Sequence, residues 1–153
     1  MRTIRGFAVV VAVTMGLMGP AFADKADDLR GQAEQGDAAA QYSLGQMYRS
    51  GQEGVAQDFA QAFKWWNMAA EQGHPLSQYR LGLMYRAGTG MPKDYVQAYK
   101  WVSLAASRFP ADYARLNSVI KDRDNIPKLM TPEQIAEARK LIEAWKPKPP
   151  PGN

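Results

Sequence analysis

The apolar residues in the middle of the chain recur at the spacing of a helix and not at the alternating spacing of a strand. One apolar stripe runs through residues 40–48 and a second runs through residues 59–70. Between them, Gly51 and Gly54 punctuate a short turn that must end the first helix. Asp58 stands just ahead of the second stripe, where an N-cap is needed. The pattern therefore predicts two helices joined as a hairpin.

The sequence pattern of this hairpin is repeated further along the chain. Tyr42 recurs as Tyr79, thirty-seven positions on, and Asp58 recurs as Asp94, thirty-six positions on, so the two turns differ in length by one residue. Sixteen of thirty-six aligned positions are identical, which is too many for coincidence. A unit this short cannot bury its own apolar face, so such units stack into a solenoid. We therefore expect an all-α fold.

Each copy places a glycine in the middle of its first helix, at Gly45 and at Gly82. Glycine in a helix interior costs about 1 kcal/mol relative to alanine. Because both copies accept that cost, we expect a packing reason. The missing side chain should let the partner helix approach closely.

The repeated residues resemble a known family. The pattern A-x-Y-x-L-G-x-M-Y-x-x-G, followed by G-x-x-x-D-x-x-x-A-x-K-W-x-x-x-A-A, is similar to the Sel-1-like repeat family, relatives of the tetratricopeptide repeats, and stands here at residues 40–51 and 54–70. The similarity extends from Asp37 to about Ser107. It implies a right-handed α–α superhelix of two full helix hairpins plus flanking helices. It also implies a role in holding other proteins, without catalytic residues.

These observations divide the chain into six parts. We expect a signal peptide at 1–23, a half-repeat helix at 24–36, repeat 1 at 37–73, repeat 2 at 74–109, a degenerate repeat with a capping helix at 110–145, and a Pro-rich tail at 146–153. Residues 112–116 are the candidate start of a decayed third opening helix.

The C-terminal third carries a strong helix start at Thr131-Pro132-Glu133-Gln134, with Thr as N-cap and Gln as its capping-box partner. An apolar stripe follows as far as Trp145, so we expect this helix to cover the open end of the stack. The tail after it is too rich in proline for a helix, and we expect it to be extended, solvated and frayed.

The N-terminus has the features of an export signal. Arg2 and Arg5 precede a mainly apolar run, and Ala21-Phe22-Ala23 forms an A-x-A cleavage site. The apolar run is short for the ~30 Å core of a bilayer, so cleavage after Ala23 is favoured over a membrane anchor. The mature protein is then expected to be periplasmic or secreted.

Composition narrows the possible partners. The chain has no cysteine, so it offers neither disulfides nor a lipoprotein anchor. The net charge of +4 includes Arg2 and Arg5, and without them seventeen basic and fifteen acidic residues leave +2. So small an excess gives no reason to expect nucleic acid.

The residue types of the common catalytic and metal sites are too few or too far apart. His74 is the only histidine, so neither a metal cluster nor any cofactor is expected, and a place in the turn between hairpins is favoured over a general base. The glycine-rich stretch 88–94 lacks the Gly-Lys-Ser/Thr ending of a phosphate loop, and no apolar strand precedes it. Its twin at 51–58 marks it as a repeat turn. We expect no catalytic residues.

The candidates for partner contact are polar residues on the first helix of each hairpin, because in related superhelices these helices line the concave face. They are Gln41, Gln46, Arg49, Gln78, Arg80 and Arg86. They could bind acidic or main-chain groups of a partner, since arginine suits forked hydrogen bonds. Alternatively, they bridge neighbouring helices within the chain, which their recurrence in both copies favours.

The leading hypothesis is a non-enzymatic protein-protein interaction module, a scaffold or regulator of the cell envelope, that binds a peptide or protein on a concave helical face. The alternative is a cell-wall-active hydrolase or β-lactam-binding protein, in which Glu71 or His74 would carry turnover. Self-association through the first hairpin is a third possibility.

Overall fold

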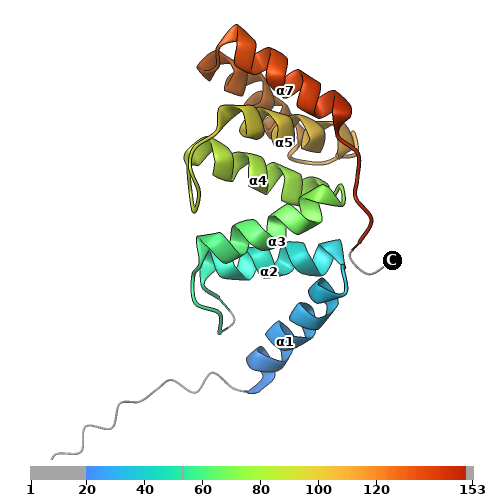
Figure 1. The fold of residues 1–153 in the computed structure, drawn as a ribbon. Coiled ribbons are helices and arrows are strands. Elements are labelled where there is room, and N and C mark those ends of the chain that lie inside the picture. Colours follow the sequence, from blue (N-terminus) through green and yellow to red (C-terminus); the bar gives the residue numbers. More distant parts are fainter. Residues whose placement is uncertain (1–19, 53, 151–153) are drawn as a thin grey trace, which may run out of the picture.

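The computed structural model describes residues 20–52 and 54–150, which form seven α-helices and one short 3-10 helix (Figure 1). The elements are α1 (Pro20–Glu34), α2 (Ala38–Ser50), α3 (Phe59–Glu71), α4 (Pro75–Ala87), α5 (Tyr95–Arg108), α6 (Leu116–Asn125), η1 (Ile126–Leu129) and α7 (Pro132–Ala144). Of the predicted signal peptide, residues 1–19 lie outside the described part, and residues 20–23 open α1.

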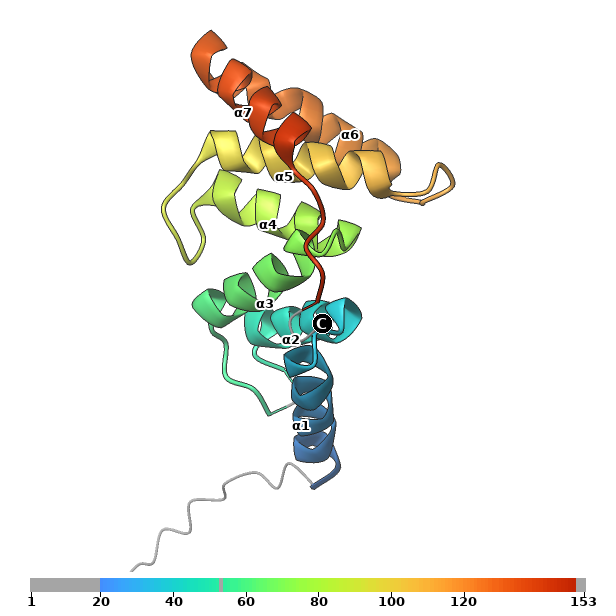
Figure 2. The same ribbon diagram turned by 45° about the vertical axis from the view of Figure 1, so that its right-hand side comes forward.

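The helices stack in chain order, each packing mainly against the one before it and the one after it as far as α5. Helices α2 and α3 form the first predicted hairpin, and α4 and α5 form the second. Figures 1 and 2 show an elongated stack with α1 at one end and α7 at the other. The predicted all-α solenoid is thereby confirmed. None of the described helices combines the length and the apolar character needed to cross a bilayer.

The predicted turn chemistry is present in both hairpins. Gly51 and Gly88 end α2 and α4 with φ of 66° and 72°, a left-handed conformation that glycine adopts without strain. The Asp58 carboxylate accepts hydrogen bonds from the backbone N–H groups at the start of α3, and that of Asp94 does so for α5. These caps fix where each second helix begins.

The two mid-helix glycines mark the closest helix contacts, as predicted. A Cβ atom on Gly82 would lie 2.6 Å from the Cγ2 atom of Val102 on α5. A Cβ atom on Gly45 would overlap the indole of Trp66 on α3. In each hairpin, therefore, the glycine leaves room for a side chain of the second helix.

The C-terminal helix covers the end of the stack, as predicted. Thr131 and Gln134 form the expected capping box. Helix α7 packs against α5, and the Trp145 ring meets the Trp101 ring edge-on with their centroids 6.3 Å apart.

The predicted third opening helix starts later than expected. Residues 112–115 form turns, and α6 begins at Leu116. The ring of Tyr113 stacks on that of Phe109, 4.3 Å between centroids and 5° from parallel. The stacked rings lie in the turn between α5 and α6, where the Tyr113 N–H also donates to the Pro110 carbonyl oxygen at 3.0 Å.

The tail is extended, as predicted, but residues 146–150 are not simply solvated. The backbone N–H of Lys148 donates to the Glu71 carbonyl oxygen at 2.8 Å, and the Lys148 ammonium lies 3.1 Å from the Glu71 carboxylate. The expectation of a frayed tail is therefore wrong for these residues. In Figure 2 the tail descends from α7 along the ends of the hairpins towards α2.

Candidate functional site

Two of the six predicted partner-binding residues are inside the protein. Gln41 and Gln78 are fully buried. The Gln41 side-chain amide donates to the Ala33 carbonyl oxygen at 2.9 Å, and that of Gln78 donates to the Ala70 carbonyl oxygen at 3.1 Å. Each amide thus adds a second donor to a carbonyl in the last turn of the preceding helix. Those carbonyls, of Ala33 and Ala70, also accept from the backbone N–H groups of Gly36 and Gly73. These two glutamines therefore do not serve as partner-binding residues; they form the internal bridges between helices that their recurrence in both copies favours.

Arg86 is also engaged within the chain. Its Nη1 atom donates to Asp122 Oδ1 at 2.8 Å, and the Tyr79 hydroxyl donates to Asp122 Oδ2 at 2.6 Å. The carboxylate therefore joins α4 to α6. Burial and the hydrogen bond to Asp122 raise the pKa of Tyr79 to about 12. Arg86 thus forms an internal bridge as well, the alternative favoured for this set, although its side chain stays 37% exposed.

The other three predicted residues, Gln46, Arg49 and Arg80, line two grooves. The first, which we call the α2–α4 groove, has a volume of about 330 Å³. It is bounded by Arg49, Phe59, Trp66, Arg80, Leu83, Met84, Ala87 and Thr89. Trp66 is buried, so its ring closes the groove from the α3 side, while one arginine stands on each of the two flanking helices.

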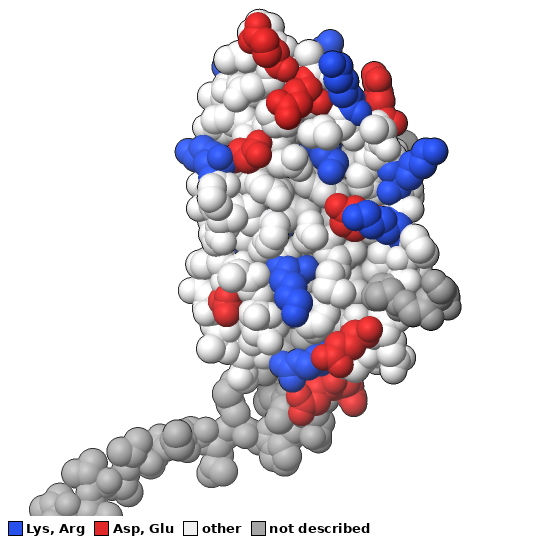
Figure 3. Space-filling view, in the orientation of Figure 1, with Lys and Arg blue, Asp and Glu red and all other residues white. Residues whose placement is uncertain are grey.

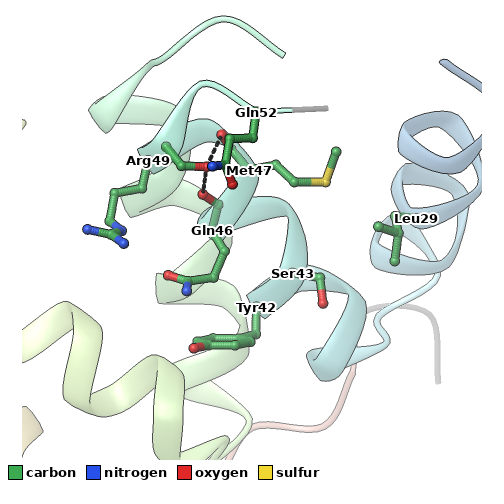
Figure 4. A pocket seen from close by; sticks show the side chains of 8 residues that line it. Leu29, Tyr42, Ser43, Gln46, Met47, Arg49 and Gln52 are labelled. Carbon is green, nitrogen blue, oxygen red and sulfur yellow. Dashed lines mark hydrogen bonds between the residues drawn. The ribbon is translucent and has the colours of Figure 1, made fainter. Parts of the chain in front are cut away.

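The second groove, the α1–α2 groove, lies on the other side of the same helix and has a volume of about 380 Å³. It is lined by Leu29, Tyr42, Ser43, Gln46, Met47, Arg49, Ser50 and Gln52 (Figure 4). Arg49 lines both grooves, so a bound segment that crosses α2 would pass its guanidinium.

Figure 4 shows that the side chains of Tyr42, Gln46 and Arg49 leave the same side of α2. The Oε1 atom of Gln46 is buried and has no hydrogen-bond partner among the described residues. A buried acceptor without a donor is costly, and a main-chain N–H of a bound polypeptide would satisfy it. Gln46 lines the α1–α2 groove, so that groove offers an acceptor beside the Arg49 cation.

Sequence reasoning missed the apolar part of the site. The apolar spacing predicts Phe59 in the stripe of the second helix, yet Phe59 is 37% exposed and lines the α2–α4 groove. Its position explains the difference, because it directly follows the N-cap Asp58 and so lies at the rim of the hairpin. Leu83 and Met84 of α4 line the same groove.

The remaining candidates have structural roles. The Nδ1 atom of His74 accepts a hydrogen bond from the Ser77 backbone N–H, which makes His74 the N-cap of α4. Burial lowers the pKa of this imidazole. Within the described part of the chain, no three His, Cys, Asp or Glu side chains gather as metal ligands would.

Charge is spread over the surface. Figure 3 shows Lys, Arg, Asp and Glu scattered singly or in small mixed groups over one face, with wide uncharged areas between them. That face carries no continuous basic band of the kind that follows a nucleic-acid backbone.

Comparison with known proteins agrees with the architecture. The Sel1 repeat family matches residues 38–74 and 75–108. A protective antigen of uropathogenic Escherichia coli that displays the SLR fold, c5321, superimposes with a TM-score of 0.70 at 33% identity over 78% of this chain. This chain spans only 24% of that antigen. A Sel1 repeat protein from Oxalobacter formigenes superimposes with a TM-score of 0.52 at 29% identity, over 79% of this chain and 98% of that one. Among curated proteins nothing matches.

Proposed function

This chain belongs to the Sel1 repeat family, and we propose that it is a non-enzymatic interaction module of the bacterial cell envelope whose α2–α4 groove binds a polypeptide segment. Sel1 repeat proteins are generally protein-interaction modules, typically without catalysis. The envelope location rests on the export signal read from residues 1–23.

The observation that carries the proposal is the composition of the α2–α4 groove. It combines exposed apolar surface at Phe59 with the arginines Arg49 and Arg80 on facing helices. Aromatic and arginine side chains are the types that contribute most to protein interfaces. In the adjoining α1–α2 groove, Gln46 adds a buried acceptor that the N–H of a peptide passing Arg49 can satisfy.

Glu71 and His74, the residues that the hydrolase alternative would use, are engaged in contacts within the chain. The Glu71 carboxylate pairs with Lys148, and the Nδ1 atom of His74 caps α4. A general acid or base has to reach a substrate proton, and these contacts instead tie the two side chains to the chain itself. This supports the binding function over turnover.

The groove is small, so we expect a single partner and a transient contact. The test is chemical crosslinking in intact cells followed by recovery of the tagged chain. Arg49→Glu and Phe59→Ser should each abolish recovery of the partner polypeptide. Lys64→Glu reverses an exposed charge on α3 that does not line the groove, so it serves as the matched control and should leave recovery unchanged. Equal recovery with all three variants contradicts the groove as the binding site.

The location has a separate test. N-terminal sequencing of the protein from a fractionated cell should find Asp24 as the first residue in the periplasmic or secreted fraction. An intact N-terminus in the cytoplasmic fraction would refute export. Partner binding by the α2–α4 groove is tested separately, by the crosslinking experiment.

A further inference from the structure

The contact between α4 and α6 shows how one repeat binds a carboxylate. Tyr79 and Arg86 lie seven positions apart on α4, so both side chains leave the same face of the helix. They hold the Asp122 carboxylate between them, with one hydrogen bond to each oxygen. A carboxylate from outside the repeat thus occupies a position that repeat 2 builds.

The same pair of residues occurs in repeat 1. Tyr42 and Arg49 correspond to Tyr79 and Arg86, and they leave α2 on the same side (Figure 4). The helix across the groove is α4, whose charged side chains are Arg80 and Arg86, with no acid among its thirteen residues. No ion pair joins Arg49 to another of the described residues. Repeat 1 therefore presents the pair without an internal carboxylate.

From this contrast we propose that Tyr42 and Arg49 form a carboxylate site that accepts an aspartate or glutamate side chain of the partner polypeptide. The proposal rests on the proposed function and specifies the chemistry of the partner. The acid would receive hydrogen bonds from the Tyr42 hydroxyl and the Arg49 guanidinium, as Asp122 does in repeat 2. Tyr42 lines the α1–α2 groove and Arg49 lines both grooves. Arg80, which lines the α2–α4 groove with Arg49, would add a second positive charge.

The electrostatics of the groove favour this occupant. Arg49 and Arg80 face a common space without an acid on either flanking helix, so an anion between them relieves their mutual repulsion. Hydrogen bonds between guanidinium and carboxylate are charge-assisted and stronger than neutral ones. Phe59 and Leu83 line the same groove, so the partner segment should carry an apolar residue next to its acid.

The tyrosine is already held in place. Its ring packs near the rings of Trp66 and His74, with centroid separations of 6.4 Å and 5.2 Å. The Trp66 indole N–H also donates to the Tyr42 carbonyl oxygen at 3.1 Å. A donor fixed before binding loses little freedom when the ligand arrives.

The experiment uses small matched probes, so it needs no identified partner. The full ¹⁵N-labelled chain is titrated with N-acetyl-aspartate N-methylamide, a blocked aspartate, and with the blocked asparagine of the same shape. The Arg49 Nε–Hε resonance, assigned by its loss in Arg49→Lys, should shift only with blocked aspartate. Arg49→Gln should weaken binding about tenfold and Tyr42→Phe about threefold or more. Lys64→Gln, the matched control, should leave binding unchanged.

A second variant tests the carboxylate contact of repeat 2. Asp122→Ala removes the internal carboxylate, so Arg86 should respond to blocked aspartate in this variant but not in the unaltered chain. Equal shifts with the aspartate and asparagine probes, shifts that persist in Arg49→Gln, or a silent Arg86 in folded Asp122→Ala would each overturn the proposal. Sodium acetate at the same concentration distinguishes a side chain on a peptide unit from a free carboxylate ion. Acetate binding as tight as that of blocked aspartate would also refute a peptide site.

The two proposals fail in different ways. If blocked aspartate binds through Arg49 but no polypeptide is recovered from cells, the interaction function fails and the carboxylate site stands. If recovery depends on Phe59 while the two probes bind equally, the carboxylate site fails and the interaction function stands.

Discussion

His74 caps α4 through its ring nitrogen: Nδ1 accepts a hydrogen bond from the Ser77 backbone N–H at 3.3 Å. Asp37 holds the equivalent position ahead of α2 and accepts from the Ala40 backbone N–H at 2.7 Å. An aspartate remains an acceptor at any pH at which it is ionised, but Nδ1 can accept only while it is unprotonated. One of two equivalent caps is therefore sensitive to mild acid.

The chain should lose stability as the pH falls below 6.5. Burial lowers the pKa of His74 from its usual value of 6.5, so in that window the unfolded chain binds the proton more readily than the folded chain. The free energy of unfolding then rises with pH and falls on acidification. We expect a loss of about 1 kcal/mol, the worth of a helix cap, measured by urea denaturation at pH 7.5, 6.0 and 5.0.

His74→Asp is the matched control, because it installs the cap that repeat 1 uses. This variant should show a smaller loss of stability between pH 6.5 and 5.0. An unchanged pH dependence would show that another group is responsible.

Asp122→Ala should loosen α6 from α4. It removes the acceptor of both the Tyr79 hydroxyl and Arg86, and we expect the free energy of unfolding to fall by about 1–2 kcal/mol. The pKa of Tyr79 should fall from about 12, because the Asp122 hydrogen bond and charge that help to raise it are removed while burial remains. An absorbance titration of the tyrosines measures this change. Asp124→Ala removes an exposed carboxylate that pairs only with the adjacent Arg123, so it should leave the Tyr79 pKa unchanged.

Gly82→Ala should destabilise the second hairpin. The new methyl would lie 2.6 Å from the fully buried Val102 and 3.1 Å from the Ala98 carbonyl oxygen. Overpacking of this kind costs about 1–3 kcal/mol, which exceeds the ~1 kcal/mol that alanine gains over glycine in a helix. Gly31→Ala, on α1, provides the contrast in thermal denaturation. A Cβ atom at that position would have no neighbouring atom within 4 Å, so this variant should raise the melting temperature. Equal shifts for the two variants would contradict the close approach.

The tail should be protected where it docks. The Lys148 amide donates to the Glu71 carbonyl oxygen at 2.8 Å, so its hydrogen should exchange several-fold more slowly than that of Lys146. Amide exchange measured by NMR checks this. Glu71→Ala removes the ion pair but keeps the backbone acceptor, and surface ion pairs contribute at most about 1 kcal/mol, so most of the protection should remain. Equal exchange at the two lysines would mean that the tail is frayed after all.

The hairpins could be predicted because their signals are local. Glycine at Gly51, aspartate at Asp58 and the apolar spacing between turns each determine a backbone feature within a few residues. Duplication then supplied the long-range information, because a unit seen twice must pack against its copy. The mid-helix glycines followed from the same argument.

The corrections concern contacts that cross between distant segments. Gln41 and Arg49 are both polar and both recur in the second copy, yet one is buried and the other exposed. Only the register of the preceding helix decides which of them meets a carbonyl. Asp122 lies outside the repeats, so nothing in the duplication pointed to its contact with Arg86. The docking of Lys148 on Glu71 likewise depends on how far α7 carries the chain.

The amide links from Gln41 to Ala33 and from Gln78 to Ala70 make the seams between units interchangeable. An additional copy of residues 37–73, spliced in ahead of His74, could place its Gln41 amide on the Ala70 carbonyl oxygen and offer its own Ala70 carbonyl oxygen to Gln78. Growth of the array by duplication would therefore keep this link at every seam.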